Sequence, residues 1–324
     1  MSTVAVAGGL GDLGRTIIDA VLASTPQHKI HILTRKTSGG KHKPPHGVNV
    51  VEVDYSSPSA MAQTLRDLKI DTVISTLNLD FEVISQSNIN LIRGAAESGV
   101  VKRFIPSDFN VDYSLSEEIF PYPEKAFHQA ARAELDKHAG LTYCSIQPGM
   151  FMDYYGMPHL ENTYLKPLYI ITDILAAKAA IPGDGKAKIA FTFTRDIGLY
   201  VGALLGLPAE KWPRDAICTG TPISSNELVE LAEEVTGTKF DVCYDSLADL
   251  RAGKVTELPS NKPFYKLFPE GKPQVDALAC NLGVAIANGV YDIKGTSLNK
   301  MFPDIKPKQM KELLIECWAG KKIG

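Results

Sequence analysis

A glycine-rich segment near the start of the chain limits the possible folds more than any other feature of the sequence. Gly8, Gly11 and Gly14 are spaced three apart, between an apolar run over Thr3–Ala7 and a pattern of apolar residues at helical spacing over 12–23. Glycines between a strand and a helix allow a tight turn, bring the backbone close to a pyrophosphate and let the helix pack on the sheet. The helix N-terminus then presents N–H groups and a partial positive charge to the phosphates. We therefore predict a dinucleotide-binding loop, with an ordinary tight turn as the alternative. Its residues are Gly8, Leu10, Gly11, Asp12, Leu13 and Gly14.

The first half of the chain alternates strand and helix patterns. Ser57 followed by Pro58 is typical of a helix start, and Gly99 is typical of a helix end. Strands alternating with helices of about 10–18 residues predict an α/β fold with a mainly parallel, doubly wound sheet. The predicted strands are 3–7, 30–34, 48–53, 72–75, 103–106 and 141–147, and the predicted helices are 12–23, 57–68, 81–98 and 123–138.

The pattern changes after about residue 152. Proline and aromatic residues are frequent from Tyr154 to Pro167, and we predict a helix from there to about Ala180. Ser224 and Glu227 form a capping-box pattern that predicts a helix to Thr236. The remaining predictions are a strand over 188–194, a helix over 196–206 with Asp196 as its N-cap, a loop over 253–275 and a helix that begins at Pro307.

These patterns predict two structural units. The first is a Rossmann-type NADP-binding domain of residues 1–152 together with about 186–222. The second is a smaller α+β substrate-cap domain of about 153–185 and 223–324. Because doubly wound sheets bind ligands at the carboxyl ends of their strands, we expect the cap to cover that edge.

Charge and cysteine content exclude several classes of protein. The 34 Lys and Arg residues against 37 Asp and Glu give a formal charge of −3, without the basic excess of a nucleic-acid-binding domain. No apolar run approaches the roughly 20 residues of a membrane-spanning helix, and the start of the chain lacks the basic region of a signal peptide. The five cysteines form no CxxC pair, which indicates reduced thiols rather than a zinc site. We expect a cytoplasmic protein with a small-molecule substrate, no metal, and no nucleic-acid or membrane partner.

The residues after the second predicted strand indicate which dinucleotide binds. A site for NAD usually has an acidic residue about 20 positions after the glycine loop. This chain has Arg35 and Lys36 there, and no carboxylate before Glu52. A guanidinium group pairs with phosphate through two hydrogen bonds, so the two cations favour the 2′-phosphate of NADP(H). A solvated basic turn is the alternative.

Several segments together resemble the NmrA-like family of atypical short-chain dehydrogenases/reductases, and its isoflavone reductase-like branch looks most similar. The resemblance implies a Rossmann-type domain, NADP(H) and a cap domain that shapes the substrate pocket. It also implies that Asp54 lies near the adenine, and that Ser75, Thr76, Pro106 and Ser107 lie near the ribose and nicotinamide. The segments are 8–14, 33–35, 53–54, 99–109 and 147–153, with 181–185, 191–198 and 225–228 also fitting.

The reductases of this family use a lysine on the helix that follows the Pro-Ser segment, and this chain departs from that pattern. Counting back from Gly140, the lysine position falls on Gln129, whose amide is not a useful acid or base. Lys125, His128, Gln129 and Arg132 share one helical face by their spacing. We expect this face to border the pocket, with Lys125 or His128 as the catalytic proton donor, because histidine titrates near neutrality. A solvated lysine and a hydrogen-bonded structural histidine are the alternative.

Further candidates for the substrate pocket follow two predicted strands. Asp108 and Phe109 come after the fifth, and Tyr154, Tyr155 and His159 come after the sixth. Tyrosines at the sheet edge can stack on or hydrogen-bond an aromatic ligand, although a structural role is an equally good interpretation.

We thus expect an NADP(H)-dependent reductase of a small aromatic or polycyclic secondary metabolite. In it NADPH supplies the hydride and the protein supplies orientation and a proton. Two alternatives stay open. Gln129 at the lysine position is compatible with a non-redox isomerase or cyclase on the same scaffold, and the NmrA resemblance is compatible with an NADP-sensing regulator without catalysis.

Overall fold

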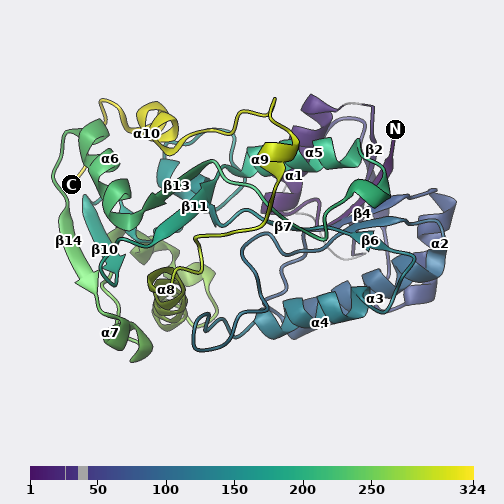
Figure 1. Ribbon diagram of the computed structural model, residues 1–324, viewed down its shortest axis with the longest axis horizontal. Coiled ribbons are helices and arrows are strands. Elements are labelled where there is room, and N and C mark those ends of the chain that lie inside the picture. The colour runs from purple at the N-terminus through teal and green to yellow at the C-terminus, as the bar shows by residue number, and fades with distance from the viewer. Residues whose placement is uncertain (26, 36–42) are drawn as a thin grey trace.

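The computed structural model describes residues 1–25, 27–35 and 43–324. Figure 1 shows two parts that lie next to each other along the longest axis. One part holds β2 (Lys29–Thr34), β4 (Thr72–Ser75) and β6 (Thr142–Tyr143) with α2 (Pro58–Asp67), α3 (Glu82–Ser98) and α4 (Lys125–Leu135). The other holds β10 (Lys178–Pro182) and β14 (Asp241–Asp245) with α6 (Ser225–Thr236), α7 (Leu247–Arg251) and α8 (Lys272–Ala287).

A parallel sheet forms the first part, as the alternating pattern predicts. Within the described chain it has six strands in the order β3-β2-β1-β4-β5-β6. Val6 of β1 lies opposite Ile32 of β2 on one side and opposite Ile74 of β4 on the other. The strand order reverses between β1 and β4, and this is the place where ligands bind in such sheets. The strands are β1 (Thr3–Ala7), β2 (Lys29–Thr34), β3 (Asn49–Glu52), β4 (Thr72–Ser75), β5 (Arg103–Ile105) and β6 (Thr142–Tyr143).

The predicted sixth strand is divided at Cys144. Its first half, β6, pairs with β5, and its second half, β7 (Ser145–Gln147), pairs with β12 (Asp215–Ile217). β12 pairs in turn with β15 (Thr296–Ser297). β7, β12 and β15 thus form a separate three-stranded parallel sheet, and β15 lies inside the range that the sequence assigns to the cap.

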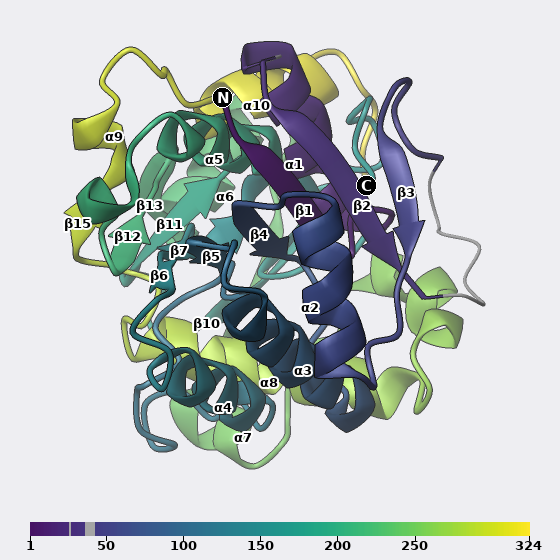
Figure 2. The ribbon, with the colours of Figure 1, turned by 90° about the vertical axis from the view of Figure 1, so that its right-hand side faces the viewer.

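Helices cover both faces of the sheet. Val4 and Val6 pack with α1 and α5, whereas the alternate residues Ala5 and Ala7 pack against the other face with α2, α3 and α4. Figure 2 shows α2, α3 and α4 together on one side of the strands. Ser57 caps α2 and Gly99 ends α3 with a φ of 69°, as predicted. The helices are α1 (Asp12–Ser24), α2 (Pro58–Asp67), α3 (Glu82–Ser98), α4 (Lys125–Leu135) and α5 (Thr194–Leu205).

The second part has its own apolar core and short three-stranded sheets. Phe191 and Trp318 lie in this core, and the capping box of Ser224 and Glu227 is present at the start of α6. The strands are β8 (Met150–Phe151), β9 (Thr172–Asp173), β10 (Lys178–Pro182), β11 (Lys188–Thr192), β13 (Thr221–Ser224) and β14 (Asp241–Asp245). The helices of this part are η1 (Met152–Gly156), α6 (Ser225–Thr236), α7 (Leu247–Arg251), η3 (Pro259–Leu267), α8 (Lys272–Ala287) and α10 (Met310–Trp318). The short helices η2 (Ala209–Lys211) and α9 (Leu298–Met301) belong to the first part, because Trp212 and Leu298 lie in its core.

Two predictions for the second half are wrong. The expected helix from Pro167 to Ala180 is an antiparallel pair of β9 and β10, because β-branched residues such as Ile171 and Thr172 favour strands. The loop expected over 253–275 contains η3 and the first turn of α8. Pro273 misled the prediction, since proline fits the first turn of a helix.

All five cysteines are free thiols. Among the described residues no helix is both long and apolar enough to cross a membrane, and no cluster of side chains is suited to hold a metal ion.

Two buried carboxyl groups connect the parts. Asp153 accepts hydrogen bonds from the backbone N–H and the hydroxyl of Thr194, at 2.8 and 2.6 Å, and so caps α5. Asp196 is the third residue of that helix rather than its N-cap, and it accepts the backbone N–H of Lys308 at 2.8 Å. Burial raises the pKa of each carboxyl group to about 6.

This burial predicts a pH-dependent stability. Since the folded pKa lies above the ordinary value of 3.8, the folded protein keeps protons that the unfolded chain has released between these two values. The stabilising contribution is complete below pH 3.8 and is lost as the pH rises through about 6. Asp196→Asn should therefore gain stability relative to wild type between pH 4.5 and pH 7.5, by about 1–3 kcal/mol.

Urea denaturation at both pH values measures this difference. Asp304→Asn, which alters an exposed carboxylate, should show almost no pH-dependent gain. An Asp196→Asn curve that runs parallel to wild type at both pH values would contradict a raised pKa in the folded state.

Candidate functional site

A cleft of about 660 Å³ lies at the carboxyl edge of the parallel sheet, where the second part meets the first. Its walls come from the glycine loop, the segments after β2, β4 and β5, and α4. The second part contributes the segments 149–154 and 165–170, one face of α8, and Tyr291. The cleft therefore has one end built by the sheet and another built mainly by the second part.

The glycine loop forms the sheet end of the cleft. Gly8 has a φ of +80°, and a Cβ there would lie 2.8 Å from the carbonyl oxygen of Thr76. A Cβ on Gly14 would lie 2.5 Å from the carbonyl oxygen of Gly8. Gly11, by contrast, has an extended backbone and precedes α1, whose N-terminus has no side-chain cap among the described residues. The loop thus leaves a helix N-terminus to face the cleft, as phosphate binding requires.

Most of the predicted loop residues line the cleft. Gly8, Leu10, Gly11, Asp12 and Leu13 do so, while Gly14 lies behind them and is needed for close packing. The positive φ of this loop belongs to Gly8, whereas Gly11 has a φ of −89°.

The end of β2 places one of the two predicted cations at the cleft. Arg35 lines it, whereas Lys36 lies outside the described residues. Asp54 does not line the cleft, because its carboxylate accepts hydrogen bonds from the backbone and hydroxyl of Ser56, which lower its pKa. Its neighbour Tyr55 lines the cleft instead and donates to the carbonyl oxygen of Leu33 at 3.3 Å.

The segments after β4 and β5 meet at the middle of the cleft. Thr76 and Ser107 line it. The Ser107 hydroxyl donates to the carbonyl oxygen of Leu77 at 2.8 Å, which ties the two segments together. Of the other two residues implied by the resemblance, Ser75 is buried and bonded to Asn88 at 2.8 Å, and Pro106 precedes Ser107 without lining the cleft.

His128 is held in the cleft wall by a buried network. Its Nδ1 lies 3.0 Å from Oδ1 of Asp108, and Oδ2 of Asp108 accepts the hydroxyl of Ser145 at 3.0 Å. The imidazole also stacks on the ring of Tyr113, with 3.7 Å between centroids. The Asp108 carboxylate favours a proton on Nδ1, so Nε2 is the ring nitrogen left to act on a ligand.

The other residues of the predicted helix face point elsewhere. The ammonium group of Lys125 is buried and donates to the carbonyl oxygens of Leu115 and Phe120, at 2.9 and 3.0 Å. Gln129 donates to the carbonyl oxygen of Tyr113 at 2.7 Å. Arg132 pairs with Asp215 and faces a different, polar cleft. The geometry therefore brings His128 to the main cleft and uses Lys125 and Gln129 to hold the segment before α4.

Among the remaining candidates after β5 and the sixth predicted strand, some line the cleft and others do not. Phe109 and Tyr154 line the cleft. Tyr155 is buried behind it with its hydroxyl 3.1 Å from the sulfur of Met150, and His159 packs edge-on against the ring of Trp318.

Sequence reasoning missed several residues that line the cleft. Asn110, Tyr113 and Tyr122 line the cleft close to the recognised Pro-Ser segment, and their proximity to that motif could have marked them. Tyr291 also lines it, but it follows no motif. Burial raises the pKa of the Tyr113 and Tyr291 hydroxyls above the ordinary value, and a hydrogen bond with Asn110 offsets part of this increase in each case.

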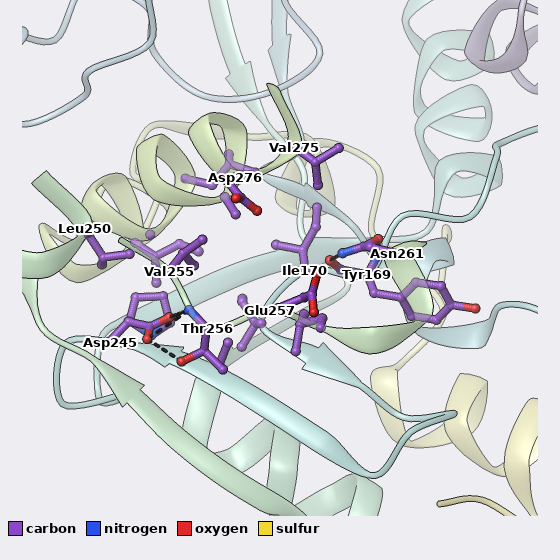
Figure 3. A pocket seen from close by; sticks show the side chains of 18 of the residues that line it. Tyr169, Ile170, Asp245, Leu250, Val255, Thr256, Glu257, Asn261, Val275 and Asp276 are labelled. Atoms are coloured by element: carbon purple, nitrogen blue, oxygen red, sulfur yellow. Dashed lines mark hydrogen bonds between the residues drawn. The ribbon is translucent and has the colours of Figure 1, made fainter. Parts of the chain in front are cut away.

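A second, much smaller cavity of about 40 Å³ lies in the second part (Figure 3). It shares Ile170 and Leu282 with the main cleft. Figure 3 shows Asp245 bonded to Thr256, whose backbone N–H and hydroxyl donate to it. This cavity is too small for a dinucleotide.

The residues present fit a phosphorylated dinucleotide. The glycine loop leaves room at the N-terminus of α1, and Arg35 stands where an NAD site has an acidic residue. Fold and loop together define a doubly wound dinucleotide-binding protein.

The comparison with protein families makes the assignment specific. The model of the NmrA-like family matches residues 1–261, and the chain belongs to this family.

Similar proteins extend over almost the whole chain. Oxidoreductase swnN of Metarhizium robertsii is 34% identical over 344 aligned positions, which cover 99% of each chain. Pinoresinol reductase 2 of Arabidopsis thaliana is 26% identical and covers 96% of this chain and 95% of its own.

Solved structures share the fold. A structure of AtPrR2 with NADP⁺ and (+)-pinoresinol has a TM-score of 0.71 at 23% identity, covering 97% of this chain and 98% of the other. A ternary complex of leucoanthocyanidin reductase from Vitis vinifera has a TM-score of 0.71 at 18% identity, covering 96% and 98%.

The geometry of the loop predicts different outcomes for two glycines. Gly11→Val should fold normally, because its extended backbone suits a β-branched residue and the added Cβ meets only the carbonyl oxygen of Gly8, at 3.0 Å. It should abolish dinucleotide binding by occupying the approach of the pyrophosphate. Gly14→Ala should instead lower the free energy of unfolding by about 1–3 kcal/mol, because its Cβ collides with backbone.

Circular dichroism, urea denaturation and NADPH titration separate the two effects. A folded Gly11→Val variant that still binds NADPH would show that this loop does not hold the phosphates.

Proposed function

We propose that the protein is an NADP(H)-dependent reductase of a small aromatic or polycyclic secondary metabolite. The observation that carries the proposal is that one cleft is lined by Arg35, by the glycine loop and by aromatic side chains, with His128 stacked on one of them, Tyr113. The oxidoreductase name of a relative that is 34% identical supports it, as does the NADP⁺ in a structure of the same fold.

Different residues of the chain would bind different parts of the cofactor along the cleft. The glycine loop and the N-terminus of α1 hold the pyrophosphate, and Arg35 pairs with the 2′-phosphate. Thr76 and Ser107 border the ribose and nicotinamide. NADPH supplies a hydride when it is bound.

His128 is the residue of the predicted helix face best placed to move a proton. Its ring lines the cleft, and Asp108 and Ser145 fix its orientation. A protonated imidazole can donate from Nε2 to an oxygen or nitrogen atom of the substrate after hydride transfer. Lys125 donates to two carbonyl oxygens and is a structural residue in this proposal.

The proposal includes a cytoplasmic location and a substrate-binding unit of about 153–185 and 223–324. A non-redox isomerase or cyclase is the second candidate, because Gln129 stands at the family's lysine position and its amide is bonded to backbone. Oxidation of NADPH distinguishes the two candidates.

The cofactor preference is testable without a substrate. NADPH should bind more tightly than NADH, and Arg35→Ala should weaken NADPH selectively, by about 1.5–3 kcal/mol for a lost charged hydrogen bond. Titration calorimetry measures each affinity. Lys29→Ala, at the other end of β2 and exposed, is the control and should change neither. Equal affinity of the wild type for both dinucleotides would refute the preference.

The role of His128 is testable by turnover. Oxidation of NADPH should be followed with a library of aromatic compounds that includes (+)-pinoresinol, the ligand of the similar structure. For a substrate found in this way, His128→Ala should lower turnover by about 100- to 10,000-fold if the imidazole is the proton donor, with little change in NADPH affinity.

Lys125→Met supplies the contrast. It should lower the free energy of unfolding by about 1–3 kcal/mol, because the carbonyl oxygens of Leu115 and Phe120, the second of them buried, lose their donor. The turnover of the folded fraction should stay nearly unchanged. Near-normal turnover in His128→Ala would exclude the imidazole as the acid, and product formation without NADPH oxidation would support the isomerase or cyclase.

A further inference from the structure

The charges that line the main cleft are separated along its length. Arg35 is at the cofactor end, and no other Lys or Arg lines the cleft within the described ranges 1–25, 27–35 and 43–324. Two carboxylates line it. Asp12 belongs to the glycine loop, whereas Asp80 follows β4 and accepts the hydroxyl of Tyr122, whose ring neighbours Tyr113 beside His128. The chamber away from the cofactor phosphates therefore has an anionic side chain and no lysine or arginine to balance it.

Asp80 is fixed in place with part of its carboxylate unused. Its Oδ1 accepts the hydroxyl of Tyr122 at 2.6 Å, and its backbone N–H donates to Asn78 at 3.2 Å. Within the described part of the chain, Oδ2 accepts no hydrogen bond and the carboxylate forms no salt bridge. Asp80 is exposed, so that a ligand in the cleft can reach this oxygen without burying an unpaired charge.

The wall next to Asp80 is aromatic. The ring centroids of Tyr122 and Tyr113 are 6.0 Å apart, and the ring of Tyr113 stacks on His128. The ring of Phe120 stacks almost parallel to that of Tyr122, with 5.5 Å between the ring centroids. Phe109 and Tyr291 also line the cleft. Aromatic faces carry negative electrostatic potential and attract organic cations within about 6 Å.

From these observations we propose that the substrate end of the cleft binds an organic cation, with an ammonium nitrogen against Asp80 and the rings of Tyr122 and Tyr113. The inference rests on the proposed function, because it specifies the substrate class of the same cleft. Among the described residues, a carboxylate or phosphate on the substrate would meet no lysine or arginine in this wall, and it would be repelled by Asp80. Asp80 is in this proposal a specificity-determining residue, away from the hydride and proton steps.

A pair of probes of equal shape tests the charge directly. In 4-hydroxyphenyltrimethylammonium, the quaternary nitrogen replaces the central carbon of 4-tert-butylphenol, and neither compound is reduced by NADPH. Calorimetric titration of the NADPH-loaded protein should give about tenfold tighter binding of the cation, from its contacts with the rings and the carboxylate. Because Asp80 is exposed, this ratio should fall when salt shortens the Debye length from about 30 Å at 0.01 M to about 3 Å at 1 M.

Two variants separate the local contact from the general charge of the surface. Asp80→Asn keeps an oxygen that accepts the Tyr122 hydroxyl and removes only the charge, and it should reduce the tenfold ratio to about twofold through weaker binding of the cation. Glu82→Gln removes the same charge two residues away, at an exposed side chain that does not line the cleft, and it should preserve the ratio.

Each outcome decides one proposal. Equal affinities for the two probes, preference for 4-tert-butylphenol, or absence of binding by both would overturn the cation site. An equal loss of the ratio in Asp80→Asn and Glu82→Gln would overturn the assignment to Asp80. Failure of the protein to bind NADPH at all would instead overturn the proposed function, and the loading step reveals it before any probe is added.

Discussion

The contact between Gly8, Gly14 and Thr76 is the constraint on which the rest of the site depends. The added Cβ atoms that would collide there meet backbone atoms of the glycine loop and of Thr76, so the loop after β1, the first turn of α1 and the loop after β4 lie closer than any side chain allows. This close approach occurs where the strand order reverses. It fixes the N-terminus of α1 at the cleft. Thr76 then lines the cleft between the glycine loop and the segment after β5.

The segment after β5 shows how a polar network can position a ring inside a mostly apolar wall. Asp108 is buried and bonded to both His128 and Ser145, which come from α4 and from β7. A buried carboxylate without partners would be unfavourable, and its two partners make it the junction of three elements. The stacking of Tyr113 on His128 then connects this junction to the aromatic chamber.

The sequence predicted those parts that local patterns determine. The glycine loop, the strands of the parallel sheet and the capped starts of α2 and α6 depend on residues close together in the chain, and each is present. The division of the sixth strand at Cys144 depends on β12, which lies some seventy residues later, and local pattern does not reveal it. The helix face of Lys125 and His128 illustrates the same limit. Their spacing places them on one side of α4, but the segment before the helix folds back and binds the ammonium group.

The path of the chain between the two parts has a consequence for how a ligand can enter. After β7, the chain forms β8 in the second part and returns as α5 against α1. It then pairs β12 with β7, leaves again for β13 and comes back to pair β15 with β12. Parts joined by repeated crossings, with the Asp153–Thr194 bonds at one of them, cannot swing apart about a single connecting segment. Entry and exit of cofactor and substrate therefore depend on the loops at the mouth of the cleft. The sequences of those loops can change to admit molecules of other sizes, while the sheets and helices that support them stay the same.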